Sequence, residues 1–183
     1  MVHRESELKR IFIAINIPVQ LREEIYNSVW KSVAQKGLKV VRAENLHLTI
    51  RFIGYLDTDA LSEVLGKLKV FESEKRFDVL LSGAGHFKGK VLWIGVSEEE
   101  KELKAIAGKV NSLLGGEGDF SAHLTIARNK DLSKSEFDSV LEKVRLNLND
   151  WKFRVKSVDV MESKLSGRGA EYSCVGKVLL KEG

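Results

Sequence analysis

The chain has 183 residues, a mass of 20.6 kDa and a formal net charge of +4. Apolar residues make up 43% of it and charged residues 31%, which suffices for a packed core and excludes a disordered chain. No apolar run reaches the roughly 18 residues of a membrane span, and the charged start does not resemble a signal peptide. The single cysteine, Cys174, excludes an internal disulfide and a cysteine-based zinc site. We expect a cytoplasmic globular monomer without a membrane segment.

The positive charge is concentrated in the first part of the chain. Residues 1–92 hold 15 Lys and Arg against 11 Asp and Glu, whereas residues 93–183 hold 15 of each kind. A mild positive excess suits an anionic partner, but it is also common on solvated surfaces.

Strands and helices alternate along the whole chain. β-branched or aromatic runs predict strands, and apolar residues at helical spacing predict amphipathic helices. In chain order we expect a strand at 11–17, a helix at 21–34, a strand at 47–54, a helix at 61–68, strands at 77–81 and 91–96, a helix at 103–114, a strand from 123, a helix at 135–146, and strands at 153–161 and 172–180. Glycine clusters between these segments predict turns, and His86 falls in one of them.

A tetrapeptide, His-Leu-Thr-Ile, occurs twice, at residues 47–50 and 123–126. Four histidines form six pairs, and the chance that any pair shares its next three residues is on the order of a few in a thousand. Each copy follows an apolar strand and a helix, and each is followed by a further helix and strand. The order therefore predicts a diverged duplication of one α+β unit, with halves at about 9–90 and 91–183 in a single domain spanning 1–183. Whether strands are exchanged between the halves stays open.

Side chains alternate between the two faces of a strand, so His47 and Thr49 share one face, as do His123 and Thr125. Imidazole exchanges protons near neutral pH, and a threonine hydroxyl can bind an anionic oxygen. If the two faces converge, two imidazoles and two hydroxyls suit the cleavage of a phosphodiester without a metal or another cofactor. By the same alternation Arg51 lies on the histidine face, whereas Arg128 reaches it only past a bulge or a strand end.

Other chemistry-bearing residues receive structural interpretations. The alternation places Phe52 on the helix-packing face, and we expect Phe52, Trp30 and Trp151 in the core. The glycine cluster at 115–118 lacks the lysine and serine or threonine of a phosphate-binding P-loop. The two histidines lack the further ligands that a zinc site requires, and we expect no bound metal.

The two His-x-Thr-x segments with their flanks, HLTIRFIG and HLTIAR, resemble the paired signatures of the 2H phosphoesterases. They are most similar to those of the RNA 2′,3′-cyclic phosphodiesterases, also called 2′-5′ RNA ligases or LigT-like proteins. The opening IFIAINIP and the segment MESKLSGRGAEY near the end also resemble that family, so the likeness covers nearly the whole chain.

The resemblance implies a bilobal α+β fold in which two antiparallel sheets form a V-shaped cleft with helices on the outside. It implies hydrolysis of a terminal 2′,3′-cyclic phosphate on RNA, tRNA fragments included, to a 2′-phosphate, with 2′-5′ ligation as the reverse reaction. On this basis His47 is the proton donor and His123 the proton acceptor, while Thr49, Thr125, Arg51 and Arg128 bind the phosphate.

Alternative functions remain open from the sequence. The same site could act on another cyclic phosphate, such as a small nucleotide or an ADP-ribose derivative. The cleft could also bind RNA ends without turnover, although binding alone does not call for two titrating groups. ATP-dependent ligation is disfavoured because no nucleotidyl-transfer lysine motif is evident.

Overall fold

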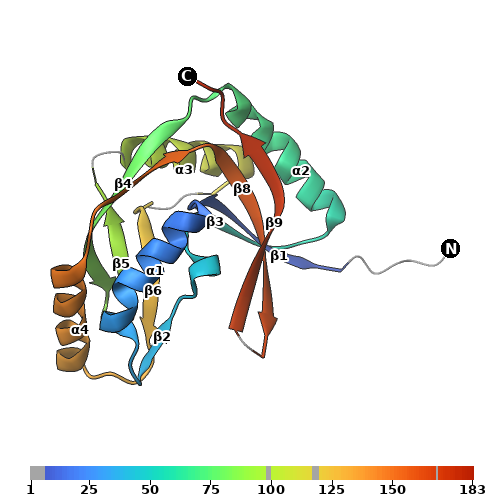
Figure 1. Cartoon of the computed structure of the whole chain (residues 1–183). Coiled ribbons are helices and arrows are strands. Elements are labelled where there is room, and N and C mark those ends of the chain that lie inside the picture. Colours follow the sequence, from blue (N-terminus) through green and yellow to red (C-terminus); the bar gives the residue numbers. More distant parts are fainter. Residues whose placement is uncertain (1–6, 98–99, 117–119, 168) are drawn as a thin grey trace.

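A computed structural model of the chain describes residues 7–97, 100–116, 120–167 and 169–183. In that part of the chain four α-helices accompany nine strands, whose main hydrogen-bonded path runs β7-β4-β5-β6-β3-β1-β8-β9, with β2 paired to β6. Figure 1 shows the strongly curled sheet that results, and these strands pair in antiparallel fashion. The elements are β1 (Lys9–Asn16), α1 (Val19–Val33), β2 (Leu38–Val40), β3 (His47–Leu56), α2 (Thr58–Leu68), β4 (Phe77–Phe87), β5 (Val91–Val96), α3 (Glu100–Leu114), β6 (His123–Asn129), α4 (Lys134–Asn147), β7 (Trp151–Val155), β8 (Ser157–Ser166) and β9 (Gly169–Leu179).

The α+β class is confirmed, but the expected pair of separate sheets is not what the structure has. Strands β7, β4, β5 and β6 form one part of the sheet, and β3, β1, β8 and β9 form the other. The two parts are joined where β3 meets β6, through the single residue pair Leu48–Leu124. The short edge-to-edge contact makes one continuous sheet from what the sequence suggested as two.

The helices are specified by ordinary amphipathic and capping signals. The Asp57 side chain caps α2 by accepting a hydrogen bond from the Ala60 amide at 2.8 Å. Ser133 and Glu136 form a reciprocal capping box at the start of α4. No helix within the described residues is long and apolar enough to cross a bilayer.

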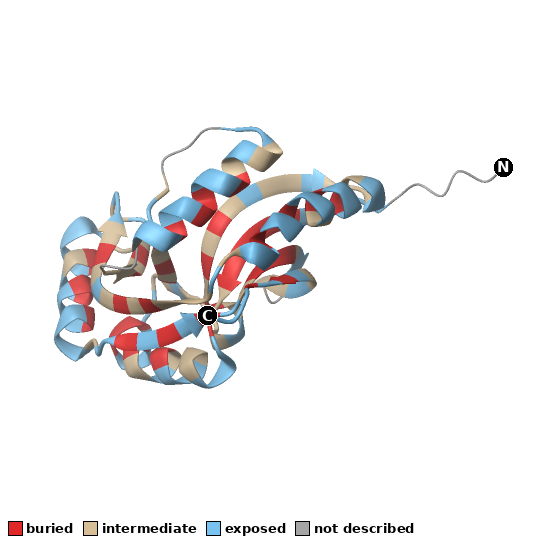
Figure 2. Ribbon diagram, turned by 90° about the horizontal axis from the view of Figure 1, so that it is seen from above, coloured by how far each residue is buried: buried red, intermediate tan, exposed pale blue. Residues whose placement is uncertain are grey.

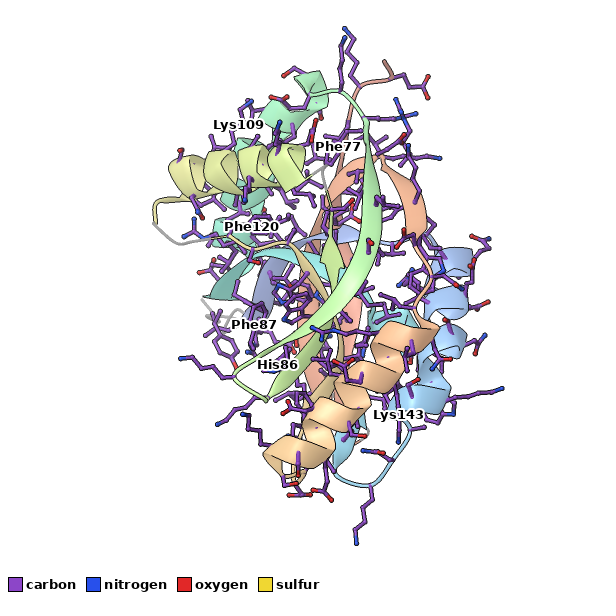
Figure 3. The ribbon with its side chains drawn as sticks, turned by 90° about the vertical axis from the view of Figure 1, so that its left-hand side faces the viewer. Phe77, His86, Phe87, Lys109, Phe120 and Lys143 are labelled. Carbon is purple, nitrogen blue, oxygen red and sulfur yellow. The ribbon has the colours of Figure 1, made fainter. Side chains whose placement is uncertain are left out.

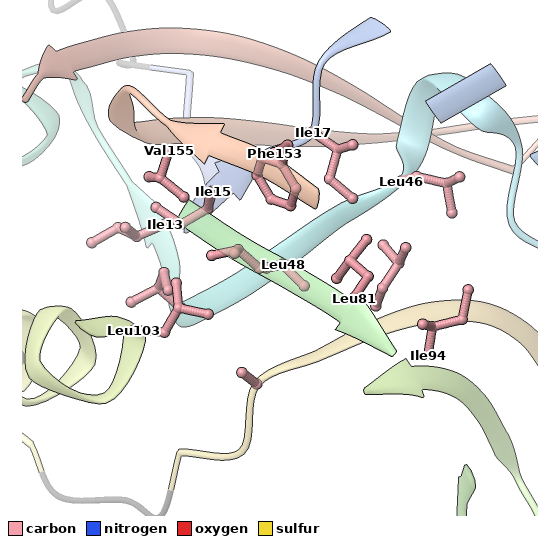
Figure 4. Close-up of a cluster of buried hydrophobic side chains, with 14 of the residues drawn as sticks. Ile13, Ile15, Ile17, Leu46, Leu48, Leu81, Ile94, Leu103, Phe153 and Val155 are labelled. Carbon is pink, nitrogen blue, oxygen red and sulfur yellow. The ribbon is translucent and has the colours of Figure 1, made fainter. Parts of the chain in front are cut away.

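All four helices pack on the same face of the sheet as Leu48 and Leu124, which we call the core face. Both leucines are fully buried, in one cluster with Leu103 of α3 and Phe137 of α4. Figure 4 shows part of this cluster, and Figure 2 shows that the buried residues of the helices lie on the sides turned toward the strands. Trp151 is buried as expected, with its indole N–H donating to Glu24 at 2.9 Å.

Several expected boundaries are wrong for identifiable reasons. The strand expected at 153–161 is divided at Lys156, because β7 pairs with β4 whereas β8 pairs with β1 and β9 on the other side of the molecule. Strand β4 extends to Phe87, so His86 lies in a strand and the turn comes after it. Strand β2 was not foreseen, since three residues give too short a pattern.

Candidate active site

The two His-x-Thr segments lie side by side, where β3 and β6 meet. Leu48 pairs with Leu124 in antiparallel register. Each leucine stands between a histidine and a threonine of its own strand. Since both leucines point into the core, His47, Thr49, His123 and Thr125 share the opposite face, which we call the histidine face. The antiparallel register sets the histidine of each copy toward the threonine of the other, in a local two-fold arrangement.

The two imidazoles are held in the same way. Nδ1 of His47 donates to the Asn45 carbonyl oxygen at 2.7 Å, and Nδ1 of His123 donates to the Ser121 carbonyl oxygen at 2.8 Å. A carbonyl can only accept, so in each neutral ring Nδ1 carries the proton and Nε2 is left to accept one. Nε2 of His47 accepts from the Thr49 hydroxyl at 2.9 Å.

His47 is half-buried and lies near the positive charges of two arginines. Its pKa is lowered from 6.5 to about 4, mainly by burial and further by electrostatic interaction with Arg22, His123 and Arg128, against the hydrogen bond to Asn45 that raises it. The His47 ring is therefore neutral at pH 7 in the free protein. The guanidinium groups of Arg22 and Arg128 favour an anion beside this ring.

Aromatic rings flank both histidines. The His47 ring lies 5.0 Å from Phe12 and 5.2 Å from Tyr172, and the His123 ring lies 4.8 Å from Phe87, all between ring centroids. Phe87 stands at the end of β4, beside the turn into β5 (Figure 3). These aromatic neighbours could not be predicted from the sequence, because Phe12 lies in an uninterrupted apolar strand whose pattern does not distinguish its two faces.

Arg51 does not lie on the histidine face, so the alternation predicted for it is wrong. On β3, Thr49 pairs with Ala14 and Arg51 with Ile13, which leaves Ile50 as the extra residue of a β-bulge. Arg51 therefore shares the core face with Ile13, and its guanidinium donates to the Gly115 carbonyl oxygen just beyond α3. The same shift brings Phe52 onto the histidine face, where it is 66% exposed and 5.8 Å from the Phe12 ring instead of buried in the core.

Arg128 does reach the histidine face, through a matching bulge in β6. Thr125 pairs with Trp93 and Ala127 with Leu92, so Ile126 is the extra residue. Arg128 then pairs with Val91, which is on the same face of β5 as Trp93. The two copies thus carry bulges at equivalent isoleucines, and of the two arginines only Arg128 lies on the histidine face.

Arg22 of α1 is a further residue that sequence reasoning missed. It donates from Nη1 to the Glu44 carbonyl oxygen at 2.7 Å, and its charge acts on His47. Its Nε is buried without a hydrogen-bond partner among the described residues. No sequence motif marks it, since it sits on an ordinary amphipathic helix.

The residues described form no cluster of three or more His, Cys, Asp and Glu side chains that could hold a metal ion. The chemistry available at the histidine face is proton exchange by two imidazoles beside hydroxyl and guanidinium groups. That combination is typical of enzymes that act on phosphate esters.

Comparison with known proteins agrees with that class. Residues 18–166 match the family model of the 2′-5′ RNA ligase superfamily. The RNA 2′,3′-cyclic phosphodiesterase of Methanocaldococcus jannaschii is 30% identical over 174 residues, covering 91% of this chain and 98% of that protein. The Escherichia coli enzyme of the same name is 29% identical over 135 residues, covering 67% of this chain and 73% of that protein. The chain therefore belongs to the 2′-5′ RNA ligase superfamily.

A solved structure supports the fold in particular. The crystal structure of E. coli LigT complexed with 3′-AMP superposes with a TM-score of 0.79 at 22% identity, covering 96% of this chain and 99% of that one. At this identity the likeness establishes the shared architecture.

Proposed function

We propose that the protein hydrolyses RNA 2′,3′-cyclic phosphate ends to 2′-phosphates without a metal, by acid–base catalysis between His47 and His123. The observation that carries the proposal is the Leu48–Leu124 pair, which sets two His-x-Thr copies on one face in opposed orientation. The names of the relatives supply the substrate class.

In the proposed reaction His123 takes a proton from water through Nε2, and the water oxygen bonds to phosphorus. The bond between phosphorus and the 3′ oxygen breaks, and His47 gives that oxygen its proton from Nε2. The products are a 2′-phosphate and a 3′-hydroxyl, and exchange with solvent restores both rings. The same sequence with a 5′-hydroxyl in place of water would give a 2′-5′ linkage and a 3′-hydroxyl.

The donor role requires His47 to be protonated when substrate is bound. Its ring is neutral in the free protein, but a phosphate anion near Arg22 and Arg128 offsets their charge and favours the imidazolium form. Substrate binding and protonation of His47 are thus coupled. The division of roles between the histidines follows the family resemblance. Because Nδ1 of each ring is held by a backbone carbonyl, Nε2 is the nitrogen that exchanges the proton, and in His47 the Thr49 hydroxyl must release it first.

Thr49, Thr125 and Arg128 are proposed to bind the phosphate oxygens. The Thr49 hydroxyl can turn from His47 toward a bound anion, and Arg128 lies on the same face as both threonines. Arg51 is left out of this group because its guanidinium is directed to Gly115.

The two arginines make a matched test of the phosphate site. Arg128→Ala is expected to lower kcat/KM for a cyclic phosphate about 100-fold, the usual effect of removing one donor to a developing charge. Arg51→Ala is expected to leave it within about threefold, since Arg51 contacts a loop carbonyl. Steady-state hydrolysis of 2′,3′-cyclic AMP by both variants measures this. A larger loss in the Arg51 variant would contradict the assignment.

The proposal itself is tested by conversion of an RNA 2′,3′-cyclic phosphate to a 2′-phosphate. An oligonucleotide that binds tightly but stays unchanged would favour the RNA-end binding function instead. Turnover confined to a small cyclic nucleotide or an ADP-ribose cyclic phosphate would point to that substrate class.

A further inference from the structure

A large open pocket adjoins the histidine pair and has no part in the proton transfers. Its volume is about 820 Å³, and it lies between the end of α1 and β2 on one side and the start of β9 on the other. The Lys39 side chain reaches toward Gly169 across this space, 3.4 Å from where a β-carbon on that glycine would stand. Figure 1 shows α1, β2 and β6 grouped beside the β8–β9 hairpin.

The pocket is connected to the site through three shared residues. Tyr172 lines it and contacts the His47 ring, while Asn45 lines it and its backbone carbonyl accepts the hydrogen bond from His47 Nδ1. Arg128 lines it as well, and its charge acts on His47. A molecule whose end lies at the histidines would therefore continue into this pocket.

The charge of the pocket wall is one-sided. Among the described residues that line it there are five cations and no carboxylate; the cations are Lys36, Lys39, Arg42, Arg128 and Lys130. Arg42 is paired with Glu44 at 3.3 Å, but none of the other four makes an ion pair with another described residue. Lys39 and Arg128 are direct neighbours across the β2–β6 pairing. Such a surface favours a ligand with several negative charges.

The same pocket exposes an aromatic surface. Trp30 of α1, which the sequence analysis placed in the core, is 43% exposed and lines the pocket. Its ring packs against Tyr26, which also lines the pocket, with centroids 5.2 Å apart. Cationic side chains interleaved with exposed aromatic rings are the pattern of single-stranded nucleic acid binding, in which bases stack and phosphates are neutralised.

We propose that this pocket binds the RNA nucleotides on the 5′ side of the cyclic phosphate, with phosphates at Lys39 and Lys130 and a base on Trp30. A 2′,3′-cyclic phosphate can exist only on the last nucleotide, so the rest of the RNA must leave the site in the 5′ direction. The inference rests on the proposed function and narrows it to single-stranded RNA of several nucleotides, in preference to a mononucleotide.

The first experiment compares two substrates, a cyclic phosphate-ended RNA decamer and 2′,3′-cyclic AMP. The Lys39→Gln/Lys130→Gln protein is expected to lose about tenfold in kcat/KM for the decamer and to keep that for cyclic AMP within about twofold. For the decamer, the slope of log kcat/KM against log salt concentration should be shallower by about 1.4 than in the wild type. Each phosphate contact with single-stranded RNA contributes roughly 0.7 to that slope. The matched control is Lys69→Gln/Lys101→Gln, which removes two exposed lysines outside the pocket and should leave both substrates unchanged.

Binding of a fluorescein-labelled decamer ending in a 2′-phosphate separates this inference from the proposed function. Weaker binding to the Lys39→Gln/Lys130→Gln protein than to the control supports this pocket as the RNA-binding site, even if the wild-type protein hydrolyses nothing. Equal binding to both proteins, or an equal loss for decamer and cyclic AMP, would overturn it. Trp30→Leu should weaken decamer binding several-fold, and an unchanged affinity would contradict the stacking of a base on Trp30.

Discussion

Replacing either His47 or His123 with alanine is expected to lower kcat for a 2′,3′-cyclic phosphate by about 10²- to 10⁴-fold. Each ring supplies one of the two proton transfers, and the other described histidine, His86, lies on the core face beside Phe137. The double variant should lose little more than the single ones, because the two transfers belong to one step. Thr49→Val and Thr125→Val should have smaller effects, about tenfold, since each removes one neutral hydrogen-bond donor.

His86→Ala is the matched control for these histidine variants. His86 lies on β4, where Nδ1 accepts from the Gly89 amide at 3.0 Å and the ring contacts Phe137 of the core. Its replacement should leave the turnover of cyclic AMP unchanged. Thermal unfolding of each variant excludes a general loss of structure, and unaltered turnover in the His47 variant would contradict the mechanism.

The free protein is expected to lose stability on acidification because of His47. Its pKa is about 4 when folded and about 6.5 when unfolded, so between these values the unfolded chain binds the extra proton. The stability that depends on a neutral His47 ring is fully present above pH 6.5 and is lost as the pH falls toward 4. From pH 7 to pH 4.5 the free energy of unfolding should fall by about 2–3 kcal/mol through this one group.

Urea unfolding of the wild-type protein and of His47→Gln at both pH values isolates the effect. Other titrating groups are common to the two proteins, so the wild type should lose about 2–3 kcal/mol more than the variant. A bound phosphate ester should reduce the difference, since it favours the protonated ring. Parallel losses in the two proteins would show that His47 is not desolvated in solution.

The repeated tetrapeptide allowed the histidines and threonines of the candidate site to be predicted from the sequence. A strand alternates its side chains regardless of tertiary context, so the pairing of His47 with Thr49 and of His123 with Thr125 on one face was accessible. The apolar faces of the helices were equally accessible, because their periodicity reflects burial against the same core.

The bulges at Ile50 and Ile126 were not accessible, and they decide where both arginines lie. A bulge arises from the register between two strands, which neighbouring residues in one strand do not encode. One extra residue in each strand moved Arg51 and Phe52 to faces opposite to those predicted, and it brought Arg128 onto the histidine face. The change of pairing partner between β7 and β8, on either side of Lys156, also depends on contacts between distant parts of the chain, as does the exposure of Trp30. A local sequence pattern does not encode such contacts.

The most direct test of the central claim uses the wild-type protein, treated with EDTA, and a 5′-labelled RNA ending in a 2′,3′-cyclic phosphate. The reaction is run in H₂¹⁸O, and the product ends are resolved as 2′- or 3′-phosphate and weighed by mass spectrometry. Two-histidine catalysis predicts complete turnover to a 2′-phosphate carrying one ¹⁸O. A 3′-phosphate product, or activity that vanishes with EDTA and returns with added metal, would contradict it.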